Sequence, residues 1–445
     1  MSASVSSHSP IRLITKHISP KRGLKLRIMV QSPVSLRCTQ NRTHVKVNSP
    51  ATLFVAIDLN ASAVVSQSPA RNPLNIALTI DCSGSMQEDN KFDFAQEAAV
   101  SLVKSLRPTD TISIVSFETK ARVEVPLTQA SDPYYLEKSI IAIPLGKETD
   151  LYEGLRLAWE QIRQAARPGV VSRVITITDG EPTHGKTKEK DFVKLAEEIG
   201  QSGIPVTTLG VGIKYNERLL MSISQATGSL WYHVSNASFM SDIFSEEVTQ
   251  MSRTVMQNPI LTITPHEGTE ILDAYTMRPM VSKLLLPLTH PHYDFKLKDI
   301  VTGEDQTVFL RLRIPGRPAG QYSLLRAQLG PQTSELTIVS TEDEQLANVE
   351  SDPYPRLLWV AGDGLTQVQH WLDGETHAKV SAETRLRTLV ADPNLATVVR
   401  SNPNLDTAVT QLRQVHDEAT RIAPGNMSED DKKRLRQQTT VLKRR

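Results

Sequence analysis

The chain has 445 residues, a formal net charge of +1, 39% hydrophobic residues and 22% charged residues. This composition is that of an ordinary globular protein with about two to four domains, and the near-neutral charge argues against a whole-protein role on nucleic acids or membranes. The two cysteines lack the spacing of a zinc site or a disulfide framework, and no apolar run approaches the ~18 residues of a membrane span. We therefore expect a cytoplasmic protein.

The N-terminal part is predicted to be a flexible arm over residues 1–22, followed by a β segment over 23–72. Its first acidic residue is Asp58, so the arm is basic and serine-rich, as in an organelle transit peptide. The alternation in residues 24–30 favours a strand over an amphipathic helix, and a transit peptide is therefore the minor alternative. Further short, β-branched strands are predicted over residues 43–47 and 53–59.

Residues 73–255 alternate between apolar strands and amphipathic helices. The helix over residues 92–106, for example, has Phe94, Ala98 and Leu102 on one face. Such alternation predicts a mostly parallel, Rossmann-like sheet with helices on both faces, whose ligands bind at the carboxyl ends of the strands. Buried strands are predicted over residues 76–80, 170–178 and 206–211, and an edge hairpin over 111–117 and 122–127.

The last two segments have different patterns. Residues 256–341 are predicted to form short strands separated by Pro and Gly turns, a pattern typical of an antiparallel β-sandwich. The α/β domain is either flanked by this sandwich or inserted into it, in which case the N-terminal strands complete the sandwich. Residues 342–445 are predicted to be a helical tail with helices over 357–372, 382–390, 405–422 and 429–442.

The most informative motif is Asp81-Cys-Ser83-Gly-Ser85, which directly follows a predicted buried strand. It places one carboxylate and two hydroxyls on a tight turn, and oxygen donors of this kind suit a hard cation such as Mg²⁺. Asp179 follows a second buried strand, so its carboxylate should reach the same edge of the sheet. The alternative is that Asp81 forms a turn and the serines cap the next helix.

Together with Gly146-Lys-Glu-Thr149 and Thr178-Asp179-Gly180, this motif resembles the von Willebrand factor A (VWA) family over about residues 74–254. In that family, a metal-ion-dependent adhesion site combines Asp-x-Ser-x-Ser, a distant threonine and an aspartate after a later strand. The resemblance implies a sheet of about six strands and a bound Mg²⁺, with Mn²⁺ or Ca²⁺ as alternatives. The metal ligands that it implies are Asp81, Ser83, Ser85, Thr149 and Asp179.

The resemblance implies a non-enzymatic, Mg²⁺-dependent protein–protein interaction module, in which a Glu or Asp of the partner protein completes the metal coordination. The flanking β segments and helical tail also resemble those of stand-alone bacterial VWA proteins. The alternative function is an accessory subunit of an AAA+ ATPase of the MoxR or chelatase type. The chain has no GxxxxGK[ST] motif, so another chain would hydrolyse ATP.

A phosphatase-like hydrolase ranks third, because Ser83 stands where haloacid-dehalogenase phosphatases need a second aspartate. His184 is expected to be a surface-loop residue and not part of a hydrolytic triad. The basic C-terminal end is expected to be a solvated helix end, with no specific nucleic-acid partner. The identity of the partner protein and the oligomeric state do not follow from the sequence.

The turn after the serines departs from the family pattern. Many bacterial relatives have Met-x-Gly-x-Lys there, whereas this chain has Met86-Gln-Glu-Asp-Asn-Lys91, which is one residue longer and has no glycine. Glu88 and Asp89 fall where the integrin β subunit has an adjacent metal site. Acidic residues near a helix start are usually solvated, so we expect no second cation here.

Overall fold

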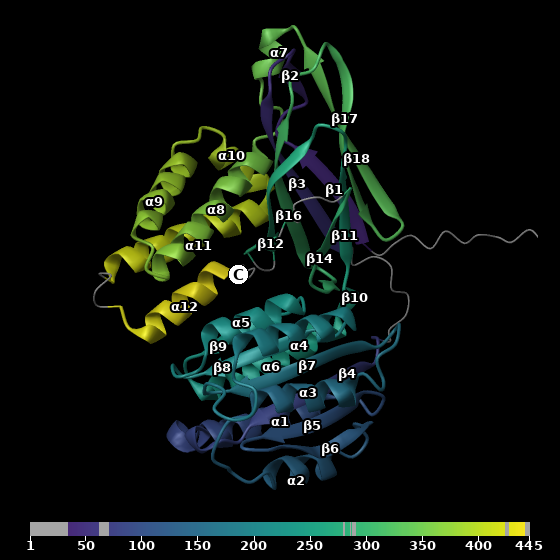
Figure 1. Cartoon of the computed structure of the whole chain (residues 1–445), viewed down its shortest axis with the longest axis vertical. Helices are drawn as coiled ribbons and strands as arrows, with labels where there is room; N and C mark the ends of the chain where they lie inside the picture. Colours follow the sequence, from purple (N-terminus) through teal and green to yellow (C-terminus); the bar gives the residue numbers. More distant parts are fainter. Residues whose placement is uncertain are drawn as a thin grey trace, which may run out of the picture. The chain divides into compact units, whose positions relative to one another are not determined.

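The computed structural model describes residues 34–61, 71–278, 281–284, 286, 291–422 and 427–440. The predicted arm and the predicted strand over residues 24–30 lie outside these ranges. The described residues form an α/β domain with a mostly parallel sheet, two antiparallel sheets and C-terminal helices (Figure 1). This arrangement confirms the predicted fold class.

The sheet of the α/β domain has the strand order β6-β5-β4-β7-β8-β9, and residues 71–278, which contain it, are all described. Its neighbouring strands are parallel except in the β5–β6 hairpin. Every residue of β4, β7 and β8 is buried, as expected for strands covered on both faces. The strands are β4 (Leu74–Asp81), β5 (Thr111–Phe117), β6 (Ala121–Gln129), β7 (Val171–Thr178), β8 (Val206–Val211) and β9 (Trp231–Val234).

Helices cover both faces of this sheet, and alternate residues of β4 contact opposite layers. Ile76, Leu78 and Ile80 pack in the cluster of α1, α2 and α6, whereas Ala77 packs in the cluster of α3, α4 and α5. The short helix η1 (Gly84–Asn90) joins β4 to α1, and η2 (Ala237–Phe239) precedes α6. The helices are α1 (Lys91–Ser105), α2 (Pro133–Ile141), α3 (Leu151–Ile162), α4 (Glu189–Gln201), α5 (Glu217–Ala226) and α6 (Met240–Ser252).

Two mainly antiparallel sheets enclose a separate apolar core, and each contains strands from both sides of the α/β domain in the sequence. β3 pairs with β16, and β2 pairs in parallel with β18. The N-terminal strands therefore share these sheets with the later strands. One sheet has the order β1 (Val34–Gln40), β3 (Ala51–Ala61), β16 (Asp305–Ile314), β12 (Glu270–Arg278) and β13 (Ser282–Lys283). The other has β14 (Tyr293–Lys296), β11 (Ile260–Pro265), β17 (Gly320–Leu329), β18 (Gln332–Thr341) and β2 (His44–Lys46). A small ladder pairs β10 (Thr254–Met256) with β15 (Ile300–Val301).

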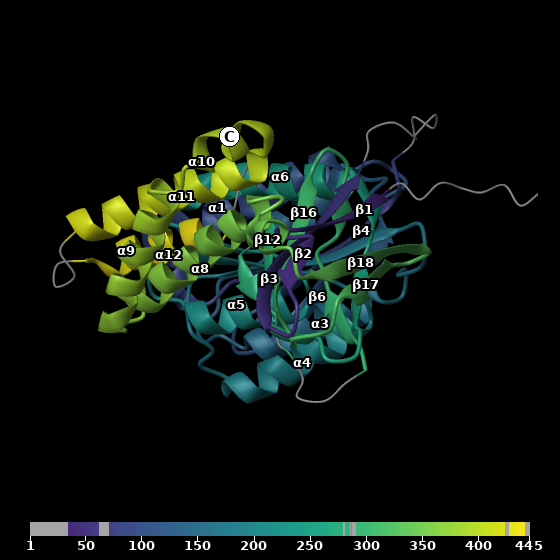
Figure 2. The ribbon, with the colours of Figure 1, turned by 90° about the horizontal axis from the view of Figure 1, so that it is seen from above.

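The C-terminal helices pack against the first of these sheets (Figure 1, Figure 2). The ring of Trp359 lies 5.4 Å from that of Phe54, and Gly362 allows the close approach of Met277. Among the described residues, no helix has the length and apolar character needed to cross a membrane. The helices are α7 (Glu344–Asn348), α8 (Tyr354–Leu372), α9 (Thr376–Val390), α10 (Leu395–Ser401), α11 (Pro403–Arg421) and α12 (Glu429–Thr440), of which the short α7 and α10 were not predicted.

Candidate metal centre

Asp81 is the last residue of β4 and is completely buried. Its Oδ1 accepts a hydrogen bond from the backbone N–H of Ser83 at 2.8 Å, and its Oδ2 accepts one from Thr178 Oγ1 at 2.6 Å. Burial raises the pKa of Asp81 to about 6, although the hydrogen bonds from Ser83 and Thr178 oppose this shift. The carboxylate is thus fixed in position, and these hydrogen bonds compensate its buried negative charge only in part.

The two serines connect Asp81 to Asp179. The Oγ atoms of Ser83 and Ser85 lie 3.2 Å apart, and Ser85 Oγ donates a hydrogen bond to Asp179 Oδ1 at 2.6 Å. Asp179 follows β7 directly, and β7 is the parallel neighbour of β4. The expected convergence of Asp81 and Asp179 at one edge of the sheet is therefore observed.

Thr149 reaches the same place from the loop before α3. Its backbone N–H donates to Thr183 Oγ1 at 2.9 Å, and its carbonyl accepts from the N–H of Thr183, which ties this loop to the loop after β7. The Oγ1 of Thr149 and the Oγ of Ser85 lie 3.7 Å and 3.8 Å from the point that a β-carbon on Gly180 would occupy. The structure thus brings all five predicted ligand residues together.

Lys91, at the start of α1, also belongs to this cluster, although no role was predicted for it from the sequence. Its Nζ donates to Asp179 Oδ2 at 2.8 Å, and the residue is only 7% exposed. The longer turn before it contains Asp89 and Asn90, which both have a φ of 55°. Asp and Asn adopt this left-handed conformation more readily than most residues, which explains how the turn forms without a glycine.

These side chains form a donor set that fits a hard cation. Three hydroxyls and two carboxylates converge, and Mg²⁺ prefers oxygen ligands of these types. Among the described residues, no group of three or more His, Cys, Asp or Glu is placed to hold a metal ion. A cation at this edge would therefore depend on the serine and threonine oxygens as much as on the aspartates.

The geometry argues against a second cation site at Glu88 and against a hydrolytic triad that would combine Ser85 with Asp179 and His184. Glu88 accepts a hydrogen bond from Lys214 Nζ at 2.8 Å and lies 3.9 Å from Lys91 Nζ, so ammonium groups already balance its charge where a second cation was considered. His184 Nδ1 lies 2.8 Å from a carboxylate oxygen of Glu148, and Ser85 bonds to Asp179. The hydrolytic triad of Ser85, Asp179 and His184 is therefore not formed.

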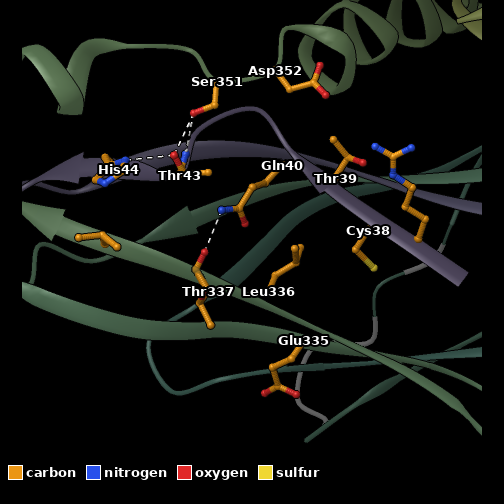
Figure 3. Close-up of a pocket in the computed structure, with 12 residues that line it drawn as sticks. Cys38, Thr39, Gln40, Thr43, His44, Glu335, Leu336, Thr337, Ser351 and Asp352 are labelled. Carbon is orange, nitrogen blue, oxygen red and sulfur yellow. Dashed lines mark hydrogen bonds between the residues drawn. The ribbon is translucent and has the colours of Figure 1, made fainter.

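A pocket of about 450 Å³ lies away from this cluster, between β1 and β18 (Figure 3). Gln40 donates to the carbonyl of Thr337 at 2.8 Å, and Thr43 contacts His44 and Ser351. None of the five predicted ligand residues lines this pocket. It is thus a separate feature of the antiparallel sheets and not part of the candidate metal centre.

The parallel sheet with its two helical layers and the cluster at its carboxyl edge together define the class of the domain. Residues 75–246 match the family model described as von Willebrand factor type A domain. Residues 75–246 therefore form a VWA domain. Domains of this class generally act as protein–protein interaction modules.

Similar proteins occur in bacteria. The chain is 28% identical to the uncharacterized protein YfbK of Escherichia coli over 185 residues, which are 41% of this chain and 32% of YfbK. It is 26% identical to the uncharacterized protein sll0103 of Synechocystis over 388 residues, which are 82% of this chain and 87% of sll0103. The chain thus spans about a third of the first relative and most of the second.

Among solved structures, a von Willebrand factor type A protein from Catenulispora acidiphila is similar with a TM-score of 0.70 at 17% identity. The similarity covers 93% of this chain and 98% of that one. The shared fold therefore includes the antiparallel sheets and C-terminal helices as well as the VWA domain.

Proposed function

We propose that this chain is a Mg²⁺-dependent protein–protein interaction module whose cation site accepts a carboxylate from a partner protein. The observation that supports the proposal most is the continuous arrangement of oxygen donors at the carboxyl edge of the sheet. Hydrogen bonds connect Asp81 to Ser83, and Ser85 to Asp179, while the two serine hydroxyls face each other. The residues proposed to hold the cation are Asp81, Ser83, Ser85, Thr149 and Asp179.

The hydrogen bonds leave oxygen lone pairs available for a cation. Ser85 uses its hydroxyl proton on Asp179, so the oxygen of Ser85 keeps lone pairs for coordination. Each carboxylate oxygen of Asp81 accepts one hydrogen bond and has two lone pairs. A bound divalent cation would supply a positive charge that attracts a partner carboxylate, and the neutral hydroxyl ligands would not cancel that charge.

Binding explains this arrangement better than catalysis. The two serine hydroxyls contact each other and Asp179, and the histidine nearest in sequence to Asp179 pairs with Glu148. A hydrolase of the Ser-His-Asp type would require a histidine within hydrogen-bond reach of the serine, whereas Ser85 bonds directly to the Asp179 carboxylate. A role as an accessory subunit of an AAA+ ATPase and a cytoplasmic location stay predictions from the sequence.

Thermal unfolding with and without Mg²⁺ tests the cation site. At a hundredfold excess of Mg²⁺ over its Kd, the folded state should gain about 2.7 kcal/mol, because only the folded chain assembles the donors. Asp81→Asn combined with Ser83→Ala should abolish this gain. Ser139→Ala, which removes a half-buried hydroxyl that bonds within α2, is the matched control and should retain it. Equal melting temperatures of the wild type in saturating Mg²⁺ and in chelator would refute the proposal. The same measurement with Mn²⁺ and Ca²⁺ would compare the three cations.

Partner binding is tested with the immobilised full chain. A carboxylate-bearing partner should be retained in Mg²⁺ and released by chelator, and Ser85→Ala should retain less of it. The partner should also lose binding when its own candidate Asp or Glu is replaced by Asn or Gln. Retention that is unchanged by chelator would argue for a different binding surface.

A further inference from the structure

The buried ion pair between Lys91 and Asp179 lies inside the proposed cation site. Asp179 uses its Oδ1 to accept from Ser85 and its Oδ2 to accept from Lys91 Nζ, at 2.6 Å and 2.8 Å. We infer that Lys91 sets the net charge of this site, weakening cation binding and strengthening the attraction for an anionic partner, an inference that rests on the proposed function.

The surrounding backbone holds the lysine in this position. Lys91 is the first residue of α1, and the left-handed turn at Asp89 and Asn90 leads directly into it. On the other side, a β-carbon on Gly212 would lie 3.6 Å from Lys91 Cε, so the loop after β8 packs closely along the lysine side chain. The ammonium group is thus fixed beside Asp179 and is not free to move into solvent.

The charges of the cluster explain what the lysine does. Asp81 and Asp179 contribute two negative charges, Lys91 cancels one of them, and the hydroxyl donors are neutral. With a divalent cation bound, the cluster would therefore carry one net positive charge, whereas without the lysine it would be neutral. Since the cluster is buried, its charges are weakly screened by water, and a difference of one unit has a large effect on a nearby carboxylate.

An ion pair with a purely structural role makes a different prediction. It would stabilise the fold, and its removal would affect cation and anion binding only through loss of folded protein. A charge-setting lysine instead shifts the two affinities in opposite directions, because the same positive charge repels the cation and attracts the anion. The sign of the two shifts separates these roles.

The test uses Lys91→Gln, which keeps a hydrogen-bond donor for Asp179 but removes the charge. Calorimetric titration with Mg²⁺ should give a Kd about tenfold or more lower than that of the wild type. Acetate binding to the Mn²⁺-loaded chain can be monitored through the loss of water-proton relaxation enhancement. Its Kd should rise about tenfold in this variant. Lys91→Arg should restore both values towards those of the wild type, since it restores the charge.

Lys104→Met is the matched control, because it removes an exposed ammonium group in the last turn of the same helix, where Lys104 pairs with Glu137 and not with Asp179. It should leave both affinities unchanged. If the wild type binds no Mg²⁺, the proposed function fails and this inference fails with it. If the wild type binds Mg²⁺ but Lys91→Gln leaves the Mg²⁺ or the acetate affinity unchanged, the charge-setting role of Lys91 alone is refuted.

Discussion

Gly180 lies next to two of the candidate ligand hydroxyls. A β-carbon at this position would make ordinary contacts with Thr149 Oγ1 and Ser85 Oγ, at 3.7 Å and 3.8 Å. An alanine would therefore fit, whereas the γ-methyl groups of a valine would extend into the space between the hydroxyls. We expect Gly180→Val to abolish stabilisation by Mg²⁺ and Gly180→Ala to retain it.

Thermal unfolding of both variants with and without Mg²⁺ provides the measurement. The metal-free melting temperatures should remain close to that of the wild type, since Gly180 does not have a positive φ that a side chain would strain. Stabilisation of Gly180→Val by Mg²⁺ equal to that of the wild type would mean that the cation does not bind between Thr149 and Ser85.

The sequence was sufficient to predict the five candidate ligands but not Lys91. Asp81, the two serines and Asp179 follow buried strands, and parallel strands bring such ends to one edge. Thr149 lies between two helices, and only the resemblance to the VWA family predicted it. Lys91 comes after an irregular turn whose left-handed residues, Asp89 and Asn90, set the direction of α1. No periodic pattern encodes that direction, so the contact with Asp179 becomes visible only in the folded chain.

At the level of single elements, α12 differs most from its prediction. Its basic residues were expected to form a solvated helix end, and for Lys433 this expectation is wrong. Lys433 is 5% exposed, and its Nζ donates to the carbonyls of Ile213 and Tyr215 at 2.8 Å and 3.0 Å. Its Nζ also lies 3.7 Å from the centre of the Tyr215 ring, a cation–π contact. A basic residue pattern cannot distinguish solvent from backbone carbonyls as the partner of an ammonium group.

A second contact joins the same helix to the VWA domain. His233 Nε2 lies 3.0 Å from Asp430 Oδ1, and its Nδ1 lies 2.9 Å from the Tyr215 hydroxyl. Burial lowers the pKa of His233, although the nearby Asp430 opposes this shift, so the ring is neutral at pH 7. Since an ionised Asp430 can only accept, Nε2 carries the ring proton and Nδ1 accepts from Tyr215.

Lys433→Met should therefore loosen α12 from the VWA domain. The loss of hydrogen bonds from a charged, buried group should weaken docking by about 1.5–3 kcal/mol. Hydrogen exchange over residues 429–440 should become roughly tenfold or more faster. Exchange in the loop over residues 212–216 should also become faster. Lys432→Met, which removes a neighbouring lysine that pairs with Glu429 on the same helix, is the control. If both variants exchange at the same rate, the buried lysine does not hold the helix.

At the level of the whole molecule, the pairing of β3 with β16 joins residues 51–61 to residues 305–314. The strands themselves were predictable from short β-branched runs, and a sandwich completed by the N-terminal strands was one of two open alternatives. Their register was not predictable, because pairs such as Asp58 and Thr307 are separated by the entire VWA domain in the sequence. Local patterns carry no information on such distant partners.

A buried charge network connects the VWA domain to the chain beyond it. Arg173 on β7 bonds to Glu247 on α6 at 2.8 Å and to Asp299, between β14 and β15, at 3.0 Å. Glu247 also accepts from Tyr232 and Thr207, and the carboxylates of Glu247 and Asp299 are both buried. Arg173→Met would remove the guanidinium that bonds to both buried carboxylates and leave Lys298 as a nearby positive charge without those hydrogen bonds. We expect it to lower the free energy of unfolding by about 3–5 kcal/mol.

Chemical unfolding of the full chain measures this loss, with Arg107→Met as the control because Arg107 is exposed on the same domain. The control should stay within about 0.5 kcal/mol of the wild type. Adding Glu247→Gln and Asp299→Asn to Arg173→Met should recover part of the loss, because the amides carry no unpaired charge. Their carbonyl oxygens can still accept from Tyr232 and from the backbone N–H of Asn258. A loss for Arg173→Met no larger than that of Arg107→Met would show that the network does not hold the VWA domain to the antiparallel sheets.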